Sequence, residues 1–421
     1  MRVLRAVSIG NALLLACSAA SAHAQHAGHD MAGMGADSSR VAPHTHLMVQ
    51  AIPLVTRADP SAGGAPVSQA AVSQVVAMLS ERFAGGHGAF AAALDAEGIT
   101  MPNGELNTGG YGEGFVDRRH PHTYLHELMV SGLGKAGGID WSVTAGRGFA
   151  PFGTDDPMMR PIVKFPINHH LAQILERAAI IGAARAGAVI VEGATFGGDE
   201  PSSPSSLPRA RRLGDSWSAR ATLVPLMGLE FQVSHARVAS PEEVTGIGLD
   251  QRKQSVSARA IAPHGARYVL VEWERTTERD AVRSRDVFDY GSVLVEGAVR
   301  ISAFGVALRV EQADRPEEDR LAEPFRTPRP APDLSVNGIT RWRSVTLHVA
   351  GPAQLRGVLS GIPFVELARL FADARNPQSL ATPARLYGTS RFTMLTAGIR
   401  MRLGGPHARM GRYGVADLSG P

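Results

Sequence analysis

The chain has a single cysteine, Cys17, among its 421 residues. This cysteine lies in an N-terminal segment with a charged start at Arg2 and Arg5, a short apolar core and a small-x-small sequence at residues 22–24. The pattern predicts a signal peptide over residues 1–24, because the apolar core is too short to span a bilayer. Cleavage there leaves no cysteine, which excludes disulfides and thiolate metal sites. In an alternative interpretation, Cys17 is the lipidated cysteine of a lipoprotein.

Long apolar runs and an excess of one charge are also missing. After the predicted signal peptide, no stretch reaches the roughly 18 consecutive apolar residues of a transmembrane helix. The net charge of +4 is too small to indicate a nucleic-acid partner. Phosphate-binding loops, a Ser-His-Asp order and CxxC pairs are absent from the sequence. We therefore expect neither nucleic-acid binding nor enzymatic activity.

The chain does contain short segments in which apolar and polar residues alternate. In "IDWSVTA", Trp141 and Val143 share one face, and Ser142 and Thr144 share the other. A period of two is typical of β-strands, in which successive side chains point to opposite faces. The segments are also as long as tilted strands that cross a bilayer. The alternation therefore indicates strands with one apolar and one polar face.

The connections between these segments alternate between short and long. The predicted strands are fourteen, and they span residues 86–98, 123–134, 138–148, 178–185, 187–197, 216–224, 228–238, 253–262, 266–276, 289–298, 302–312, 339–350, 354–372 and 391–403. Sorting of connections by length is typical of transmembrane barrels, whereas a soluble sandwich has no reason for it. We predict an all-β fold over residues 86–403: a transmembrane, antiparallel, up-and-down β-barrel of about 14 strands, with a range of about 12–16.

A short N-terminal periplasmic extension is expected over residues 25–85, and a C-terminal tail over residues 404–421. The pattern of residues 67–83 predicts a helix that forms a cap or plug. Residues 46–55 are consistent with an additional strand. Such a strand would make the number odd unless another strand had been overlooked.

The stretch "DRRHPHTYLHELMVSG" (117–132) allows two interpretations. In a helix, His122 and His126 would lie four residues apart beside Glu127, an arrangement that suits a zinc ion. In a strand, no compact ligand set forms. The glycines that follow favour the strand. A secreted metalloenzyme that uses His122, His126 and Glu127 is therefore a secondary hypothesis.

Three segments carry a resemblance: "YGEGFVDRRHPHTYLHELMVSG", "GFAPFGTDDPMMRPIVKFPINHHLAQILER" and "RLGDSWSARATLVPLMGLEFQVSHARVASPE". They resemble an uncharacterised family of bacterial outer-membrane β-barrels that is porin-like in architecture. The resemblance implies an outer-membrane location, with membrane lipid and the barrel-assembly machinery as partners. One departure is that the last predicted strand ends at Leu403, without the terminal aromatic residue common in such barrels; Tyr413 is the nearest.

The start of the N-terminal extension, residues 25–35, is rich in histidine and methionine, and we call it the His/Met-rich leader. It is weakly similar to outer-membrane copper resistance proteins. Imidazole and thioether groups suit copper, so the candidate ligands are His26, His29, Met31 and Met34. The alternative is a disordered linker without metal. Apart from possible copper at this leader, no cofactor is expected.

The long connection at residues 149–177 is the candidate pore constriction. Its apolar spacing predicts a helix with Asn168 as N-cap. Folded into the lumen, the connection would line a constriction with Asp155, Asp156, Lys164, His169, His170, Glu176 and Arg177. The alternative is an extracellular flap on the rim. On the strands, the polar face that we expect to point into the lumen carries Arg220, Arg259, Arg309, Arg400 and Arg402.

These features predict a porin-like channel for passive diffusion of small solutes, as a monomer or a trimer. The first alternative is a copper-binding or copper-resistance barrel, and the second is the metalloenzyme.

Overall fold

The computed structural model describes the chain from residue 45 to residue 418, with gaps. The described residues are 45–60, 65–96, 123–154, 156–201, 205–207, 210–241, 243, 245–262, 267–318, 336–356, 359–375, 382–404 and 409–418. All of them belong to one compact unit, Pro43–Pro421. The predicted signal peptide, Cys17 and the histidine- and methionine-rich leader lie outside the described residues.

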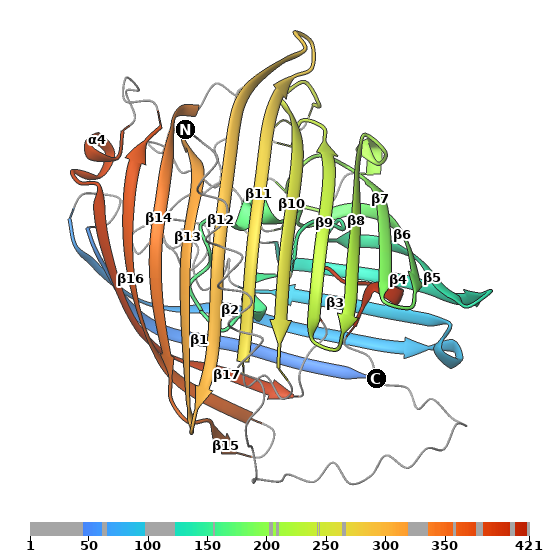
Figure 1. Ribbon diagram of the computed structural model, residues 1–421, viewed down its shortest axis with the longest axis horizontal. Coiled ribbons are helices and arrows are strands. Elements are labelled where there is room, and N and C mark those ends of the chain that lie inside the picture. Colours follow the sequence, from blue (N-terminus) through green and yellow to red (C-terminus); the bar gives the residue numbers. More distant parts are fainter. Residues whose placement is uncertain are drawn as a thin grey trace. The chain divides into compact units, whose positions relative to one another are not determined.

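The described residues form strands and a few short helical pieces in the connections (Figure 1). The strands are β1 (His46–Asp59), β2 (Val67–Phe83), β3 (Gly88–Asp95), β4 (Leu125–Ala136), β5 (Ile139–Gly148), β6 (Arg177–Ala186), β7 (Val189–Phe196), β8 (Ser216–Leu226), β9 (Leu229–Val238), β10 (Asp250–Ile261), β11 (Arg267–Asp280), β12 (Arg285–Ile301), β13 (Phe304–Glu318), β14 (Val336–Ala350), β15 (Gln354–Arg356), β16 (Leu359–Ala374) and β17 (Arg391–Gly404). The helical pieces are η1 (Ala84–Gly86), η2 (Pro157–Met159), α3 (His169–Ala172), η3 (Ala210–Arg212), α4 (Pro383–Tyr387) and η5 (Gly414–Ala416).

The strands close into a barrel. Each pairs antiparallel with its neighbours, and β1 closes the ring by pairing with both β2 and β17. The three-residue β15 pairs only with β16, whereas β14 pairs directly with β16. Of the seventeen strands in the sheet, sixteen therefore form the ring. Among the described residues, the closed ring has no open sheet edge apart from that of the short β15.

The predicted all-β barrel is confirmed, but the expected number of about 14 strands is too low. All fourteen predicted strands are present, and β1 and β2 add two more. The helix predicted over residues 67–83 is wrong, because Val67–Phe83 forms β2. Its alanine, glutamine and leucine content favours a helix locally, but the backbone pairs with β1 on one side and β3 on the other. The additional strand suggested at 46–55 is β1, and together the two keep the count even.

The two ends of the barrel differ. At one end, called the turn end, β4–β5, β6–β7 and β8–β9 are joined by two-residue turns. At the other, called the loop end, β5 and β6 are separated by residues 149–176, and β7 and β8 by residues 197–215. One predicted long connection, 277–288, is a short turn in the structure, because β11 and β12 extend to Asp280 and Arg285. Met48 of β1 pairs with Gly404 of β17, so both ends of the strand ring lie at the turn end.

The two faces of the wall have opposite chemistry. Outward side chains are apolar and exposed, such as Trp141 at 43% and Val295 at 43%. Their inward neighbours are polar and buried, such as Ser142 at 2% and Glu296 at 0%. This is the reverse of a soluble barrel, whose apolar side chains fill the inside. Among the described residues, no helix is long and apolar enough to cross a membrane.

Candidate functional site in the barrel interior

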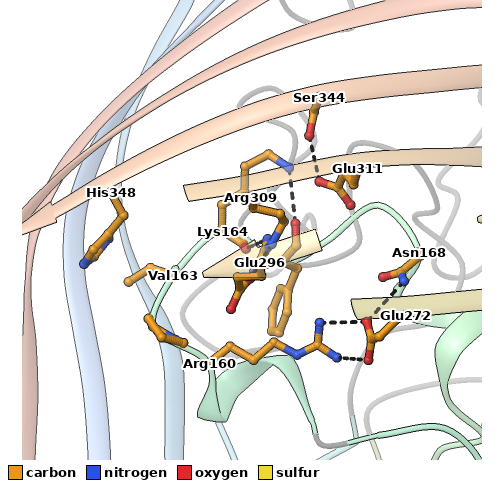
Figure 2. Close-up of polar contacts among 12 residues, drawn as sticks. Arg160, Val163, Lys164, Asn168, Glu272, Glu296, Arg309, Glu311, Ser344 and His348 are labelled. Atoms are coloured by element: carbon orange, nitrogen blue, oxygen red, sulfur yellow. Dashed lines mark hydrogen bonds and ion pairs between the residues drawn. The ribbon is translucent and has the colours of Figure 1, made fainter. Parts of the chain in front are cut away.

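Residues 149–176, which we call the crossing segment, join β5 to β6 but bond to strands elsewhere in the ring. The backbone N–H groups of Val163 and Lys164 donate to Glu366 on β16, at 2.6 and 3.2 Å. The N–H of Ile167 donates to Glu311 on β13 at 2.8 Å. Near the start of the segment, the N–H of Gly153 donates to the hydroxyl of Ser234 on β9 at 3.0 Å. The segment therefore passes through the barrel interior (Figure 2).

Buried arginines add charged contacts to this backbone attachment. Arg160 of the crossing segment donates to both oxygens of Glu272 on β11, at 2.8 and 3.0 Å. Arg309 on β13 donates to the carbonyl of Lys164 at 2.6 Å and to Glu296 on β12 at 2.6 Å. These four side chains are at most 3% exposed. Removal of one partner from such a pair leaves a buried charge without compensation, which is strongly destabilising.

Apolar packing holds the crossing segment against the wall as well. Val163 and Ile167 belong to a buried cluster that includes Trp342 of β14 and Phe392 of β17. Packing of these side chains removes apolar surface from water, which stabilises the arrangement. Polar and apolar contacts thus place the segment on the same part of the wall.

Two of the residues predicted to form the constriction, Asp156 and Lys164, are buried in the crossing segment. Asp156 is fully buried and accepts from the N–H of Met158, which caps η2. Lys164 is 1% exposed, and its ammonium donates to the carbonyl of Phe165. Burial lowers the pKa of Lys164 below its ordinary value, although Glu311 acts in the opposite direction. Asp155 lies outside the described residues.

The remaining candidates lie around the short helix and at the start of β6. His169 is 2% exposed and stacks on the ring of Phe165. Glu176 accepts from the N–H of Thr123 and lies 2.6 Å from His126 Nδ1. Arg177 pairs with Glu200 at 2.8 Å. The side chain of His170 lies outside the description.

The helix predicted in this connection is much shorter than expected. Only His169–Ala172 is α-helical, and Asn168 precedes it without a side-chain cap. Instead, the Asn168 amide donates to Glu274 on β11 at 3.1 Å. Wall carboxylates accept the N–H groups of Val163, Lys164 and Ile167. The helix ends after one turn, and beyond it the carbonyl of Ile174 accepts from the N–H of Ala150 at 3.0 Å.

The five arginines predicted to face the lumen all lie on inward positions, and each is bonded. Arg220 binds both oxygens of Glu192, at 2.6 and 2.7 Å. Arg259 pairs with Glu230, and Arg309 pairs with Glu296. Within the sheet, each arginine stands directly opposite its glutamate on the neighbouring strand.

The last two, both on β17, bond to uncharged groups. Arg400 donates to the carbonyls of Arg160 and Pro161, each at 3.1 Å. Arg402 donates to the side-chain carbonyl of Gln50 on β1 at 2.7 Å. Arg400 thus gives the crossing segment another attachment, this time to β17.

The metal helix proposed for His122, His126 and Glu127 is wrong, because Leu125–Ala136 forms strand β4. A register shift opposite Ala93 turns both His126 and Glu127 inward, although they are neighbours in sequence. His126 binds Glu176, whereas Glu127 accepts from Tyr413. Among the described residues, no group of three or more His, Cys, Asp or Glu side chains could hold a metal ion. His122 and the candidate copper ligands His26, His29, Met31 and Met34 lie outside the description.

Residues 409–418, which we call the C-terminal segment, also lie inside the barrel. The Tyr413 hydroxyl donates to Glu127 at 2.5 Å and accepts from the N–H of Phe149 at 3.0 Å. Burial and the nearby Glu127 carboxylate raise the pKa of Tyr413 well above its ordinary value. The sequence predicted a C-terminal tail over residues 404–421 and no contacts for it. The one available signal was Tyr413, the aromatic residue nearest the chain's last strand.

The C-terminal segment and the crossing segment meet at Arg220. Its guanidinium donates to the carbonyl of Gly153 at 3.2 Å and to the carbonyl of Gly411 at 3.0 Å, while it binds Glu192. One wall arginine therefore bonds to both interior segments. The Tyr413 hydroxyl makes a second link through Phe149.

Comparison with known proteins gives a likeness at the level of the fold. No family model matches the sequence, and no curated protein matches it. The structure is similar to the anion-selective porin from Comamonas acidovorans, with 11% identity, a TM-score of 0.51, and coverage of 86% of this chain and 100% of that chain. The chain has the barrel fold of outer-membrane porins. Another similar structure is in-vitro folded OmpT, an outer membrane protein of Vibrio cholerae, with 10% identity, a TM-score of 0.49, and coverage of 86% and 100%.

Proposed function

We propose that this protein is an outer-membrane channel through which small solutes diffuse passively. The outward apolar side chains, such as Trp217 at 45% and Val233 at 55% exposure, suit contact with lipid. Closure pairs both edges of each strand in the described sixteen-stranded ring, as hydrocarbon requires. The short turns would then face the periplasm and the long loops the cell exterior.

The observation that carries the channel proposal is the crossing segment inside a barrel with a polar, charged inner face. Its attachment to Glu366 and Glu311 would narrow the space left for solutes. The half-buried inward arginines Arg259, Arg400 and Arg402 would border the path on the wall, whereas the buried Asp156 and Lys164 would act on it from within the segment. Charges of both signs therefore act on a passing solute, so size and charge together would determine passage.

The proposal is tested by fractionation followed by conductance measurements. A closed barrel in the outer-membrane fraction should migrate differently on a detergent gel before and after boiling. The unboiled protein, inserted into a planar lipid bilayer, should then produce stepwise ion currents. A heat-shifted protein that produces no current would retain the barrel but contradict the channel.

A further inference from the structure

Three exposed arginines lie close together on the outward face of neighbouring strands, near the loop end: Arg369 on β16, Arg391 on β17 and Arg57 on β1. We call them the arginine patch. Arg369 stands directly opposite Thr393 of β17, and Arg391 lies two residues before Thr393 on the same face. On the other side of β17, Thr393 stands opposite Asp59, and Arg57 lies two residues before Asp59. Because such diagonal neighbours are roughly 7–8 Å apart, the three long side chains can reach one ligand.

The outward face of these strands carries charge at one end only. Toward the turn end, the outward side chains described on β1, β16 and β17 are all uncharged, for example Val49, Pro363 and Ile399. A general need for polar groups at the membrane surface would apply to both ends, because a spanning barrel meets water on both sides. The difference between the ends therefore indicates a partner that is present on one side of the membrane.

The arginines of the patch bond to hydroxyl groups rather than to carboxylates. Arg369 donates to the hydroxyl of Thr393, and Arg57 donates to the hydroxyl of Ser68 on β2 at 3.4 Å. Within the described part of the chain, none of the three arginines forms an ion pair. A neutral hydroxyl does not cancel the charge of a guanidinium group, so the positive charge of the patch is available to an anion.

The carboxylates on this face are too few to balance the arginines. Asp373 of β16 already pairs with Arg343 of β14 at 2.9 Å. Asp59 stands beside the patch on β1 and is exposed. One carboxylate against three arginines leaves an excess of two positive charges. Guanidinium groups bind phosphate oxygens with two parallel hydrogen bonds, which favours a phosphorylated ligand.

Apolar side chains continue from the patch toward the middle of the wall. Leu367 precedes Arg369 by two residues on β16, and Val55 precedes Arg57 by two residues on β1. Leu395 of β17 stands between the two strands, opposite both Leu367 and Arg57. These three side chains are 47–57% exposed and point outward. They suit the acyl chains of a lipid, whereas a free phosphate ion would use only the arginines.

We propose that the arginine patch is a binding site for the head group of a membrane lipid that carries more than one phosphate, with the acyl chains along Leu367, Leu395 and Val55. The stems of the arginines would lie along this apolar surface while their charged ends reach the phosphates. The site lies at the loop end, so the lipid would belong to the outer leaflet. This choice of leaflet rests on the proposed function, in which the long loops face the cell exterior.

The test is native mass spectrometry of the full chain in detergent micelles, with diphosphoryl lipid A as the probe. The dissociation constant is measured for the unaltered protein and for the triple variant Arg57→Gln/Arg369→Gln/Arg391→Gln. Each arginine near an anionic lipid contributes about a factor of five in affinity, so the triple variant should bind on the order of a hundredfold more weakly. The substituted side chains are exposed, so the variant should still shift on a detergent gel.

A matched control loses the same charge from exposed ends of arginines that already pair with aspartates. The control variant is Arg237→Gln/Arg275→Gln/Arg283→Gln, whose arginines pair with Asp250, Asp289 and Asp280. It should keep the affinity of the unaltered protein to within about tenfold, because its aspartates already offset these charges. Equal losses in the two triple variants, no loss in the patch variant, or no binding to the unaltered protein would overturn the proposal.

A second lipid separates charge from apolar contact. Phosphatidylcholine has no net charge, so it should bind the unaltered protein and the patch variant equally, and a matching hundredfold loss would overturn the role of the phosphates. Lipid binding requires no current. A protein that binds lipid A without conducting would contradict only the channel, and a conducting protein that does not bind it would contradict only the lipid site.

Discussion

The crossing segment and the C-terminal segment both lie inside the barrel, but they are held in different ways. The crossing segment joins two strands of the ring and bonds to β9, β11, β13, β16 and β17. The described hydrogen bonds of the C-terminal segment to the wall involve strands β4 to β9. We therefore expect the first segment to be part of the fold and the second to be an insert that can be removed without loss of the ring. Variants that weaken each segment separately test this difference.

The largest effect is expected from Arg160→Ala in the crossing segment. The substitution removes the arginine that binds both oxygens of Glu272, which is fully buried. Loss of one partner from a buried pair typically costs roughly 3–5 kcal/mol. The measurement is the free energy of unfolding by guanidinium chloride in lipid vesicles. The matched variant Arg412→Ala should cost less, since Glu192 keeps its bidentate bond with Arg220. An equal loss in both variants would contradict the proposed difference.

A smaller and more local effect is expected from Tyr413→Phe. This variant loses one bond to Glu127 and one from the N–H of Phe149, at a cost of roughly 1–3 kcal/mol. The C-terminal segment should become accessible, so trypsin should cleave after Arg409 or Arg412 faster than in the unaltered protein. Tyr124→Phe is the control, because Tyr124 is 38% exposed. Unchanged cleavage in Tyr413→Phe would show that the hydroxyl does not hold the segment.

The smallest effect is a dependence on pH. The pKa of Tyr413 is raised by burial and by Glu127, so the docked segment favours the neutral phenol. Its contribution to docking is fully present below the pKa of a free tyrosine, about 10, and is lost as the pH rises through the raised value. The difference in tyrosinate absorbance between the unaltered protein and Tyr413→Phe should therefore develop at a higher pH than that of free tyrosine. If this absorbance difference develops at the pH at which free tyrosine ionises, the segment is not docked at high pH and the prediction is contradicted.

The sequence predicted the parts of the fold that depend on neighbouring residues. Alternation along each strand identified fourteen strands, and hairpin register places Glu296 directly opposite Arg309. The composition of β2 predicts a helix, whereas pairing with β1 and β3 makes it a strand.

The interior contacts were less accessible from the sequence. The bond between Arg160 and Glu272 joins residues 112 positions apart, and no local pattern indicates which strand lies across the barrel. The bulge that turns both His126 and Glu127 inward depends on pairing with β3. The candidate residues of the connection could be named, but their partners required the closed ring.

The most direct test of the central claim, that the crossing segment limits passage through the barrel, is single-channel conductance in planar bilayers. Glu366 accepts the N–H groups of Val163 and Lys164, so Glu366→Ala should release the segment from β16 and increase the conductance. Glu366→Gln retains one acceptor oxygen and should give a smaller increase. Conductance that is the same in all three proteins, with each still shifting on a detergent gel, would contradict the claim.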